Sequence, residues 1–339
     1  MSKRSVGLLV AVTLAGIVIW SCGPSPRYHK KRSLEGHITI SGAFALYPMA
    51  TLWAEEFRRL YPEVEIDITA GGSGKGITDV LSGMVDLAMV SRDISPEEEA
   101  KGAWKIGVVM DAVVPIVNSS NPFIDSLLSR GLTPEVLQQI FVKQTITRWN
   151  DIFGISENEM NINVYTRSDA CGAAEMWAKF LHARQEMLAG VGVYGDPGIT
   201  IAIKNDPLSL GYNNLIFAYD LKTKRPFAGI TILPIDLNEN GIIESKEDFY
   251  EHLDSLQHAI QQGRYPSPPA RMLYFVSKGK PHSNAIKEFL KWVLTDGQHF
   301  VRASGYVPLP NKQRLAELSK VRLILKPLHR GKAKDTIDR

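Results

Sequence analysis

Three loops built largely of small residues carry the clearest chemical signal in this sequence. They span residues 41–48, 71–76 and 167–173, and each joins an apolar run to a helical pattern. At a helix amino terminus, unpaired backbone N–H groups and the helix dipole favour an anion, and glycines let the backbone approach it closely. Ligands of open α/β sheets bind at this same edge. Any one loop could be a tight turn, but the three together predict an anion site.

The second loop contains Gly74-Lys75 but does not fit the P-loop of nucleotide-binding proteins. That motif requires a glycine where Thr69 stands, and a serine or threonine where Gly76 stands. The loop therefore does not predict a nucleotide site.

Residues 236–247 have the ligand spacing of an EF-hand calcium loop. Such a loop needs oxygen ligands at positions one, three, five, seven and twelve, and a glycine at position six for the sharp turn. Position six is Gly241, and the five ligand positions are Asp236, Asn238, Asn240, the carbonyl of Ile242, and Glu247. A helix is expected over 247–256, where the loop should exit. The alternative is a polar surface turn. A calcium ion here would be structural, and no cofactor for activity is expected.

The amino terminus reads as an export signal over residues 1–21. Lys3 and Arg4 precede an apolar run over 6–20, which is shorter than the roughly 20 residues of a membrane span. Ile19-Trp20-Ser21-Cys22 resembles the lipobox of bacterial lipoproteins, which implies cleavage before Cys22 and a lipid on its sulfur. The alternative is an uncleaved anchor helix. Either reading places the body outside the cytoplasm, held at a bacterial membrane in the periplasm or at the cell surface.

The composition describes an ordinary globular body. The chain has 339 residues, 44% of them hydrophobic, which is enough for one large or two medium domains. A net charge of +3 with basic residues spread along the chain does not indicate nucleic acid as a partner. There are two cysteines. If Cys22 carries a lipid, Cys171 has no partner for a disulfide.

Apolar runs and helical patterns alternate along the body, so the fold class is α/β. Strands are predicted at 37–41, 64–70, 87–90, 107–117, 162–165 and 271–276, and helices at 48–61, 76–83, 133–141, 173–183 and 282–293. Strands that alternate with helices favour parallel pairing. The length of the chain indicates two lobes.

The order of the motifs resembles the phosphate-binding proteins of ABC importers. The matching segments cover nearly the whole body: residues 41–48, 53–57, 71–76, 85–92, 111, 116–118, 146–151, 167–172, 210–212 and 289–309. The resemblance implies a two-lobed periplasmic-binding-protein fold of type II, each lobe a mixed sheet flanked by helices, with the ligand cleft between the lobes. It also implies a tether at 22–35, lobe one at 36–112 and 267–325, lobe two at 113–266, and a basic tail at 326–339.

The resemblance further implies where the ligand binds. Ser73 would approach it from lobe one, and Arg167, Asp169 and the turn at Gly172 from lobe two. Arginine suits an oxyanion because its planar fork contacts two oxygens at once. Asp169 could accept a hydrogen bond from the proton that phosphate keeps near neutral pH, whereas sulfate, which lacks that proton, would be repelled. The remaining positions implied at the site are Ala45, Leu46, Ser91, Cys171 and Ala173.

Three of these positions depart from the family pattern, which usually has hydroxyl groups where this chain has Ala45, Cys171 and Ala173. Each lost donor to a buried charged ligand costs about 1.5 to 3 kcal/mol. Either Lys75 compensates or the ligand is not phosphate. The residues leave the ligand's identity and affinity, the membrane that holds the anchor and the occupancy of the calcium loop open.

The sequence therefore predicts a monomeric solute-binding lipoprotein that captures phosphate, or a related tetrahedral oxyanion, and delivers it to the membrane subunits of an ABC importer. The alternative is a similar lipoprotein with another ligand or with a sensing or interaction role. An enzyme is not expected, because the histidines lack metal-ligand spacing, no serine sits in a Gly-x-Ser-x-Gly elbow, and Cys171 has no identifiable base.

Overall fold

The computed structural model describes residues 34–154 and 159–325. The predicted signal, the lipid-bearing Cys22, most of the tether and the basic tail lie outside these residues. Within the described part, no helix combines the length and the apolar character that crossing a membrane requires.

A nine-stranded mixed sheet runs through the molecule in the order β2-β1-β3-β9-β4-β7-β5-β6, with β8 paired to β4. The strands are β1 Gly36–Gly42, β2 Val64–Ala70, β3 Leu87–Val90, β4 Ala103–Asn118, β5 Asn163–Arg167, β6 Val191–Val193, β7 Ser209–Asn214, β8 Ile230–Ile232 and β9 Ala270–Lys278. β1 pairs parallel with β2 and β3, as β5 does with β6 and β7. β4 and β9 pair antiparallel with each other and with their other neighbours. The alternation of strands and helices in the sequence favoured parallel pairing. The structure has it only among β1, β2 and β3 in one lobe and among β5, β6 and β7 in the other.

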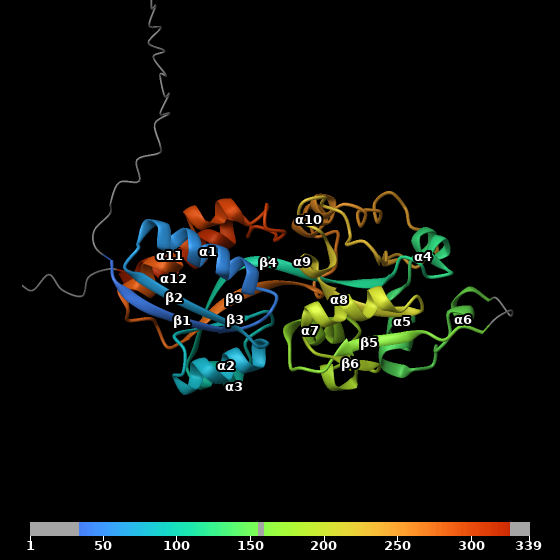
Figure 1. Cartoon of the computed structure of the whole chain (residues 1–339), viewed down its shortest axis with the longest axis horizontal. Helices are drawn as coiled ribbons and strands as arrows, with labels where there is room; N and C mark the ends of the chain where they lie inside the picture. Colours follow the sequence, from blue (N-terminus) through green and yellow to red (C-terminus); the bar gives the residue numbers. More distant parts are fainter. Residues whose placement is uncertain (1–33, 155–158, 326–339) are drawn as a thin grey trace, which may run out of the picture.

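Helices cover the sheet on both faces. They are α1 Tyr47–Leu60, α2 Ser73–Ser82, α3 Pro96–Ala100, α4 Ile124–Arg130, α5 Pro134–Gln138, α6 Trp149–Phe153, α7 Gly172–Phe180, α8 Gly195–Asn205, α9 Leu215–Ala218, α10 Leu253–Gln261, α11 Asn284–Val293 and α12 Asn311–Leu325. A π-helical turn, Gln139–Lys143, follows α5, and 3₁₀ turns occupy Gln185–Met187 and Asp296–Phe300. In Figure 1, α1, α11 and α12 lie on one side of β1, β2 and β3, and α2 and α3 on the other.

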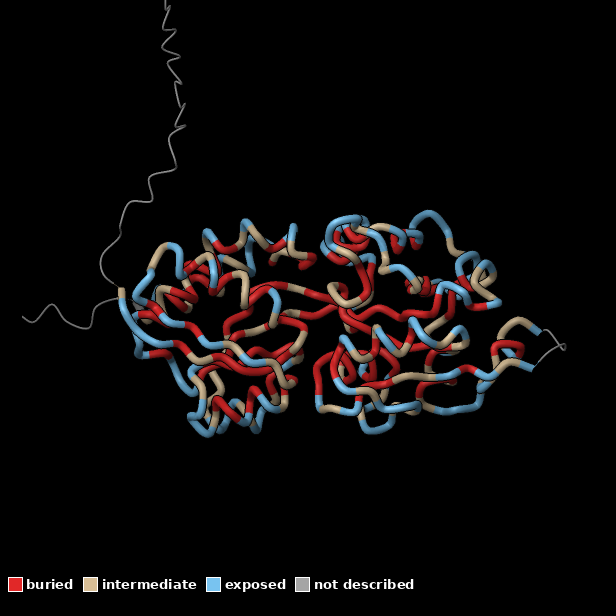
Figure 2. Tube along the Cα trace, viewed as in Figure 1, coloured by how far each residue is buried: buried red, intermediate tan, exposed pale blue. Residues whose placement is uncertain are grey.

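Two large apolar cores define two lobes. One core contains residues of β1–β3, α1, α11 and α12, and the other contains residues of α4–α10 with β5, β7 and β8. β4 and β9 run from one lobe to the other, and their buried residues form the central connection in Figure 2. The predicted lobe boundary at 112/113 falls inside β4, and the boundary at 266/267 falls just before β9. Since β4 and β9 pass from one lobe to the other without a break, the structure marks no single residue as the boundary. The predicted lobe boundaries therefore stay predictions.

The helix predicted over 247–256 is wrong, since α10 begins only at Leu253. The preceding residues form turns because their aromatic side chains are buried: Phe249 and Tyr250 both pack against Tyr265, with ring centroids 6.3 and 6.2 Å away. His252 then caps α10, and its Nδ1 accepts a hydrogen bond from a backbone N–H of the first turn. The other predicted helices and strands are present, with ends that differ by a few residues.

Candidate functional site

Each of the three loops leads into a helix, as predicted. The first ends at α1, whose N-cap is Leu46. The second ends at α2, where Gly72 takes a positive φ of 89° that favours glycine. The third ends at α7, whose N-cap is Cys171. The predicted positions of the three helix amino termini are therefore confirmed, although the first N–H of α1 is bonded to the carbonyls of Ala43 and Phe44.

The second and third loops touch across the space between the lobes. A Cβ added to Gly72 would lie 2.9 Å from the Ala170 carbonyl oxygen and 3.3 Å from Asp169 Oδ2. A Cβ added to Gly172 would lie only 2.3 Å from both the carbonyl and the hydroxyl oxygen of Ser91. Glycine is therefore required at both positions for the lobes to approach this closely, and the structure is a closed form.

Two buried hydroxyl groups from lobe one lie at this contact. Ser73 is the first residue of α2, and Ser91 follows β3. Their Oγ atoms are 3.2 Å apart, and the Ser91 backbone N–H donates to Ser73 Oγ at 3.1 Å. Both residues are almost fully buried. The Ser91 hydroxyl group therefore faces the amino terminus of α7 in lobe two, and the Ser73 hydroxyl group lies beside it.

Arg167, the last residue of β5, is the cation of the site. Its Nε and Nη2 donate to the two oxygens of Asp169 at 2.8 and 2.5 Å, and its Nη1 donates to Asp196 Oδ1 at 2.7 Å. Its side chain is 1% exposed. Burial acts to lower the pKa of Arg167, but the neighbouring carboxylates, Asp196 foremost, raise it above the usual value. Three of the five guanidinium donors are thus bonded to carboxylates, which leaves at most two for a ligand.

The residues implied at the site divide into two groups. Ser73, Ser91, Arg167, Asp169, Cys171 and Gly172 come together between the lobes. Ala45 and Leu46 are buried in the core of lobe one, and Ala173 in the core of lobe two. Within the first loop, Phe44 is the residue that reaches lobe two, because its ring centroid lies 5.7 Å from the Arg167 guanidinium carbon.

The structure explains the unpaired thiol of Cys171. Its Sγ accepts the Ala174 N–H at 3.4 Å and so caps α7, a role that a serine hydroxyl would also fill. Burial raises the pKa of Cys171 to about 12. The thiol is therefore neutral at physiological pH and does not add negative charge to the site.

Lys75 does not compensate for the missing hydroxyl groups. It forms an ion pair with Asp79, and its side chain is about half exposed. Asp79 also accepts a hydrogen bond from the Ser41 hydroxyl at 2.7 Å. The ammonium group of Lys75 therefore pairs with a carboxylate of its own helix, α2, and not with a ligand between the lobes.

Sequence reasoning missed the polar network behind Arg167. Asn214, at the end of β7, donates to Asp196 Oδ1 at 2.7 Å. The Arg271 guanidinium, on β9, donates to the Asn214 side-chain oxygen and, through Nε, to the Ser91 carbonyl at 3.1 Å. The available signal was the presence of Asn214 and Arg271 at the ends of apolar strand patterns, where a buried polar side chain needs a specific partner.

Asp111, on β4, completes this network. Its Oδ2 lies 3.5 Å from Arg271 Nη2, beyond a good hydrogen bond, and neither carboxylate oxygen has a hydrogen-bond partner among the described residues. Burial raises the pKa of Asp111 to about 6, and the attraction of Arg271 offsets only part of that effect. The strand pair that joins the lobes therefore contains a carboxyl group that titrates near neutral pH.

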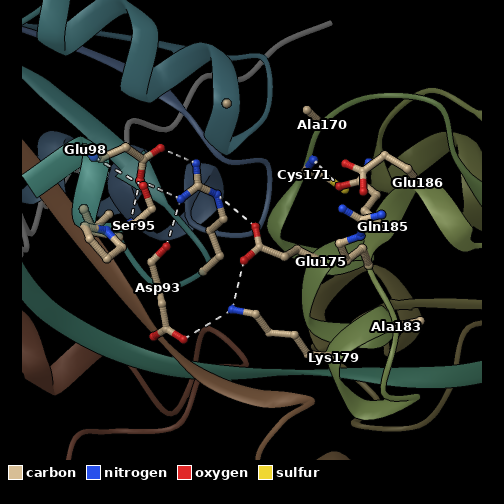
Figure 3. Close-up of a pocket in the computed structure, with 15 residues that line it drawn as sticks. Asp93, Ser95, Glu98, Ala170, Cys171, Glu175, Lys179, Ala183, Gln185 and Glu186 are labelled. Atoms are coloured by element: carbon tan, nitrogen blue, oxygen red, sulfur yellow. Dashed lines mark hydrogen bonds and ion pairs between the residues drawn. The ribbon is translucent and has the colours of Figure 1, made fainter.

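A cavity of about 620 Å³ opens beside the site, between the lobes. Arg92 from lobe one pairs with Glu98 at 2.6 Å and with Glu175 of α7 at 3.1 Å. Lys179, also on α7, lies 3.5 Å from the Asp93 carboxylate. Figure 3 shows Glu98 and Asp93 on one side of this cavity and Glu175 and Lys179 on the other. Two ion pairs therefore connect the lobes.

The chain is similar to known binding proteins. A family model described as "PBP superfamily domain" matches residues 29–297. The phosphate-binding protein PstS of Pseudomonas aeruginosa is 27% identical over 308 residues, which cover 85% of this chain and 87% of that protein. PstS of Bacillus subtilis is 24% identical over 319 residues, covering 91% and 95%. The structure of an ABC-type phosphate transport receptor from Vibrio cholerae matches with a TM-score of 0.59 at 18% identity, covering 80% of this chain and 100% of that one.

These comparisons confirm the predicted two-lobed α/β binding-protein fold. The curated relatives are binding proteins, so the prediction that the chain is not an enzyme is also confirmed.

Proposed function

Because this chain belongs to the PBP superfamily, we propose that it is an extracytoplasmic solute-binding protein that captures inorganic phosphate, or a related tetrahedral oxyanion, and delivers it to an ABC importer. The relatives named for phosphate binding support this ligand, and they match along most of their length.

One observation carries the proposal: anion-binding groups from both lobes meet at a single point. The Ser91 hydroxyl group, 3.2 Å from that of Ser73, lies against Gly172 at the amino terminus of α7, and Asp169, which holds Arg167, lies against Gly72 of the neighbouring loop. A ligand bound here would contact both lobes, so its binding energy would favour the closed form. This coupling is what a transporter needs in order to recognise a loaded binding protein.

Asp169 would provide selectivity. One of its oxygens accepts from Arg167 Nε and from the Gly195 N–H at 3.2 Å, and the other accepts from Arg167 Nη2 and lies toward Gly72 of lobe one. A carboxylate oxygen has more than one lone pair, so it can accept a further proton from monohydrogen phosphate. Sulfate has no such proton and would meet only charge repulsion.

Calorimetry on the exported body with phosphate, arsenate, sulfate and molybdate tests the proposal. Phosphate and arsenate, which both keep a proton near neutral pH, should release heat with a common stoichiometry. Arg167→Ala should abolish most binding, whereas Asp169→Asn should chiefly reduce discrimination against sulfate, because the amide can donate as well as accept. Arg130→Ala, on exposed α4 of the same lobe, is the matched control and should bind as the unaltered chain does. Heat with none of the oxyanions would refute the proposal.

A second candidate function is supported by the two carboxylates that already occupy three hydrogen-bond donors of Arg167. Its contacts with Asp169 and Asp196, together with Cys171 and Ala173 in place of hydroxyl-bearing residues, favour a different ligand or a sensing or interaction role. Cys171→Ser separates these functions, because Cys171 is the one of the three departing positions that lines the cavity between the lobes. Tighter phosphate binding would identify a weakened phosphate site. Weaker binding of whichever ligand the unaltered chain prefers would identify a repurposed one.

We further propose that a lipid on Cys22 anchors the protein to a bacterial membrane. The support is the apolar run that ends at Ile19-Trp20-Ser21-Cys22. Mass spectrometry of the mature amino terminus should find a lipidated cysteine, and Cys22→Ala should release the protein from the membrane fraction. An unmodified terminus at another residue would exclude the anchor.

The proposed partners are the membrane subunits of the importer, and the proposed state in solution is a monomer. Light scattering of the exported body measures its mass directly, and a dimer mass would contradict the second statement.

A further inference from the structure

We propose that residues 236–247 bind a calcium ion that fastens this loop to lobe two. The inference is independent of the proposed phosphate site, because the loop belongs to the opposite end of lobe two from α7 and shares no residue with the cleft. Its first support was the ligand spacing. The structure adds the folding of the loop, the burial of its carboxylates and an oxygen without a partner.

The backbone of the loop curls around its own side chains. Asp236 Oδ2 accepts the Gly241 N–H at 2.8 Å, Asn238 Oδ1 accepts the Asn240 N–H at 3.0 Å, and Asn240 Oδ1 accepts the Ile242 N–H at 3.0 Å. Gly241, at position six, has a φ of 78°, which makes the sharp turn possible. The oxygens of positions one, three and five are therefore all held by the backbone of the loop itself.

The carboxylate of Glu247 closes the loop from its far end. Its Oε1 accepts the N–H groups of Leu237 at 3.0 Å and Asn238 at 3.3 Å, and the residue is 7% exposed. Its Oε2 accepts from Asn238 Nδ2 at 3.4 Å. Position twelve thus lies against positions two and three, at the start of the loop, where a bidentate calcium ligand is expected. The carbonyl of Ile242, at position seven, supplies the remaining protein oxygen.

An unpaired oxygen provides an independent sign of a ligand. Asp236 is 1% exposed, and its Oδ1 has no hydrogen-bond partner among the described residues. A buried carboxylate oxygen without a partner is unfavourable and rare in folded proteins. Since Oδ2 of the same carboxylate bonds inside the loop, Oδ1 is held at the loop as well. A cation there would satisfy it.

The ligand chemistry selects calcium. The proposed shell contains only oxygen, from two carboxylates, two amides and a carbonyl, and such a shell suits a hard cation. Within residues 34–154 and 159–325, no group of three or more His, Cys, Asp or Glu side chains is placed to hold a metal ion, so the proposed shell depends on the amide and carbonyl oxygens as well as on the two carboxylates. Magnesium is reluctant to shed its water for a cage of this kind. With only two charged ligands, an affinity of about 10⁻⁴–10⁻³ M, as in extracellular modules, is expected.

The loop is attached to the rest of lobe two on both sides. The Ile243 N–H donates to the Ser129 carbonyl of α4 at 2.8 Å, and the Asp236 N–H donates to the Leu132 carbonyl at 3.1 Å. A Cβ added to Gly131 would lie 2.5 Å from Ile243 Cδ1. An ion that holds positions one and seven together would therefore also hold α4 against the loop.

The test uses the full-length chain in detergent, in a phosphate-free buffer so that calcium phosphate cannot form. Calcium chloride at ten to a hundred times the dissociation constant should raise the melting temperature by about 2 to 4 °C, by mass action on the folded state. Magnesium chloride at equal ionic strength should give a smaller shift. Terbium(III) bound in the loop should luminesce when the protein's aromatic side chains are excited. Tyr250 is the expected donor of this energy, because its hydroxyl oxygen lies 3.3 Å from the nitrogen of Ile235, the residue before Asp236.

Two loop variants make the result specific. Glu247→Gln keeps an oxygen for the Leu237 and Asn238 N–H groups but loses the charged, bidentate ligand, so calcium and terbium should bind at least about ten-fold more weakly. Glu239→Gln removes the same charge from position four, which is not a ligand position, and should bind as the unaltered chain does. Equal weakening in both variants would mean that the cation only neutralises surface charge, which overturns the proposal. So would the absence of both the melting shift and the luminescence.

Discussion

Glu175→Gln should open the lobes and weaken ligand binding without disturbing the ligand's own contacts. The Glu175 carboxylate lies on α7 of lobe two and pairs with Arg92 of lobe one at 3.1 Å and with Lys179 of its own helix at 3.0 Å. Glutamine keeps the shape of the side chain and removes its charge. Of the two pairs that Glu175 makes, only the one with Arg92 joins the lobes, so its loss shifts the balance from the closed form to the open form, whereas the pair with Lys179 is lost from both forms.

The size of the effect follows from the surroundings of the pair. Two unit charges about 4 Å apart near a protein surface attract by roughly 4 kcal/mol before desolvation and side-chain entropy are subtracted, and measured values for exposed pairs are about 0.2 to 1 kcal/mol. The Arg92 side chain is 14% exposed and that of Glu175 31%, so this pair should reach the upper end. Arg92 keeps its two bonds to Glu98 and is not left as an uncompensated buried charge. A loss of about 1 kcal/mol corresponds to about five-fold weaker binding.

Calorimetry measures the affinity, and alkylation of the thiol measures the opening. In the body without residues 1–22, Cys171 is the remaining cysteine and lines the cavity that this ion pair closes. It should react faster in Glu175→Gln, and high salt should narrow the difference from the unaltered chain. Glu186→Gln removes the same charge from the same rim and is the control, because no ion pair involving Glu186 occurs in the described part of the chain. Unchanged affinity and unchanged alkylation in Glu175→Gln would refute the reasoning.

Three further predictions concern the lobe contact, the connecting strands and the core. Gly172→Ala should prevent closure and greatly weaken binding, since the new Cβ would sit 2.3 Å from two Ser91 oxygens; the melting temperature of the unliganded protein should change little. The folded-state pKa of Asp111 is about 6, above its ordinary 3.8, so its stabilising effect is complete below about pH 4 and is lost as pH rises to about 6. Urea unfolding should measure this loss as the difference in unfolding free energy between the unaltered chain and Asp111→Asn. The difference should fall by about 3 kcal/mol between about pH 4 and pH 6, because each pKa unit corresponds to about 1.4 kcal/mol. A difference that does not change with pH would contradict this. Trp177→Ala should cost about 3 to 5 kcal/mol in the same urea assay, because its fully buried ring stacks on Tyr212 with centroids 5.6 Å apart; a loss below 1 kcal/mol would show that the core refills the cavity.

Local sequence patterns predicted the parts of the fold that depend on neighbouring residues. The strand at 87–90 has the predicted ends, since a short apolar run bounded by polar residues admits few alternatives. The loops that precede α1, α2 and α7 were also predicted, because small residues between a strand and a helix mark a helix amino terminus. The pairing of β9 between β3 and β4 was not evident, because it depends on the return of the chain from lobe two.

Local sequence patterns related only some of the residues of the candidate site to one another. Arg167 and Asp169 are two residues apart, so a local pattern could relate them. Asp196 lies 29 residues from Arg167 and meets it only because α8 docks beside β5. No spacing rule describes such a contact. The helix expected at Glu247 failed for a similar reason, since burial of Phe249 on distant Tyr265 outweighed local helix preference.

The route of β4 and β9 also orders folding during synthesis, when a chain emerges amino terminus first. Apart from Val307, every buried residue of the second core lies between Ala112 and Ala270. The first core needs residues from β1 and also from Leu273 to Val321. The second lobe can therefore complete its core while the first still lacks β9, α11 and α12, and the first strands must wait for the carboxyl-terminal third of the chain. A truncated chain that ends before β9 would consequently leave lobe two compact and lobe one exposed to proteolysis.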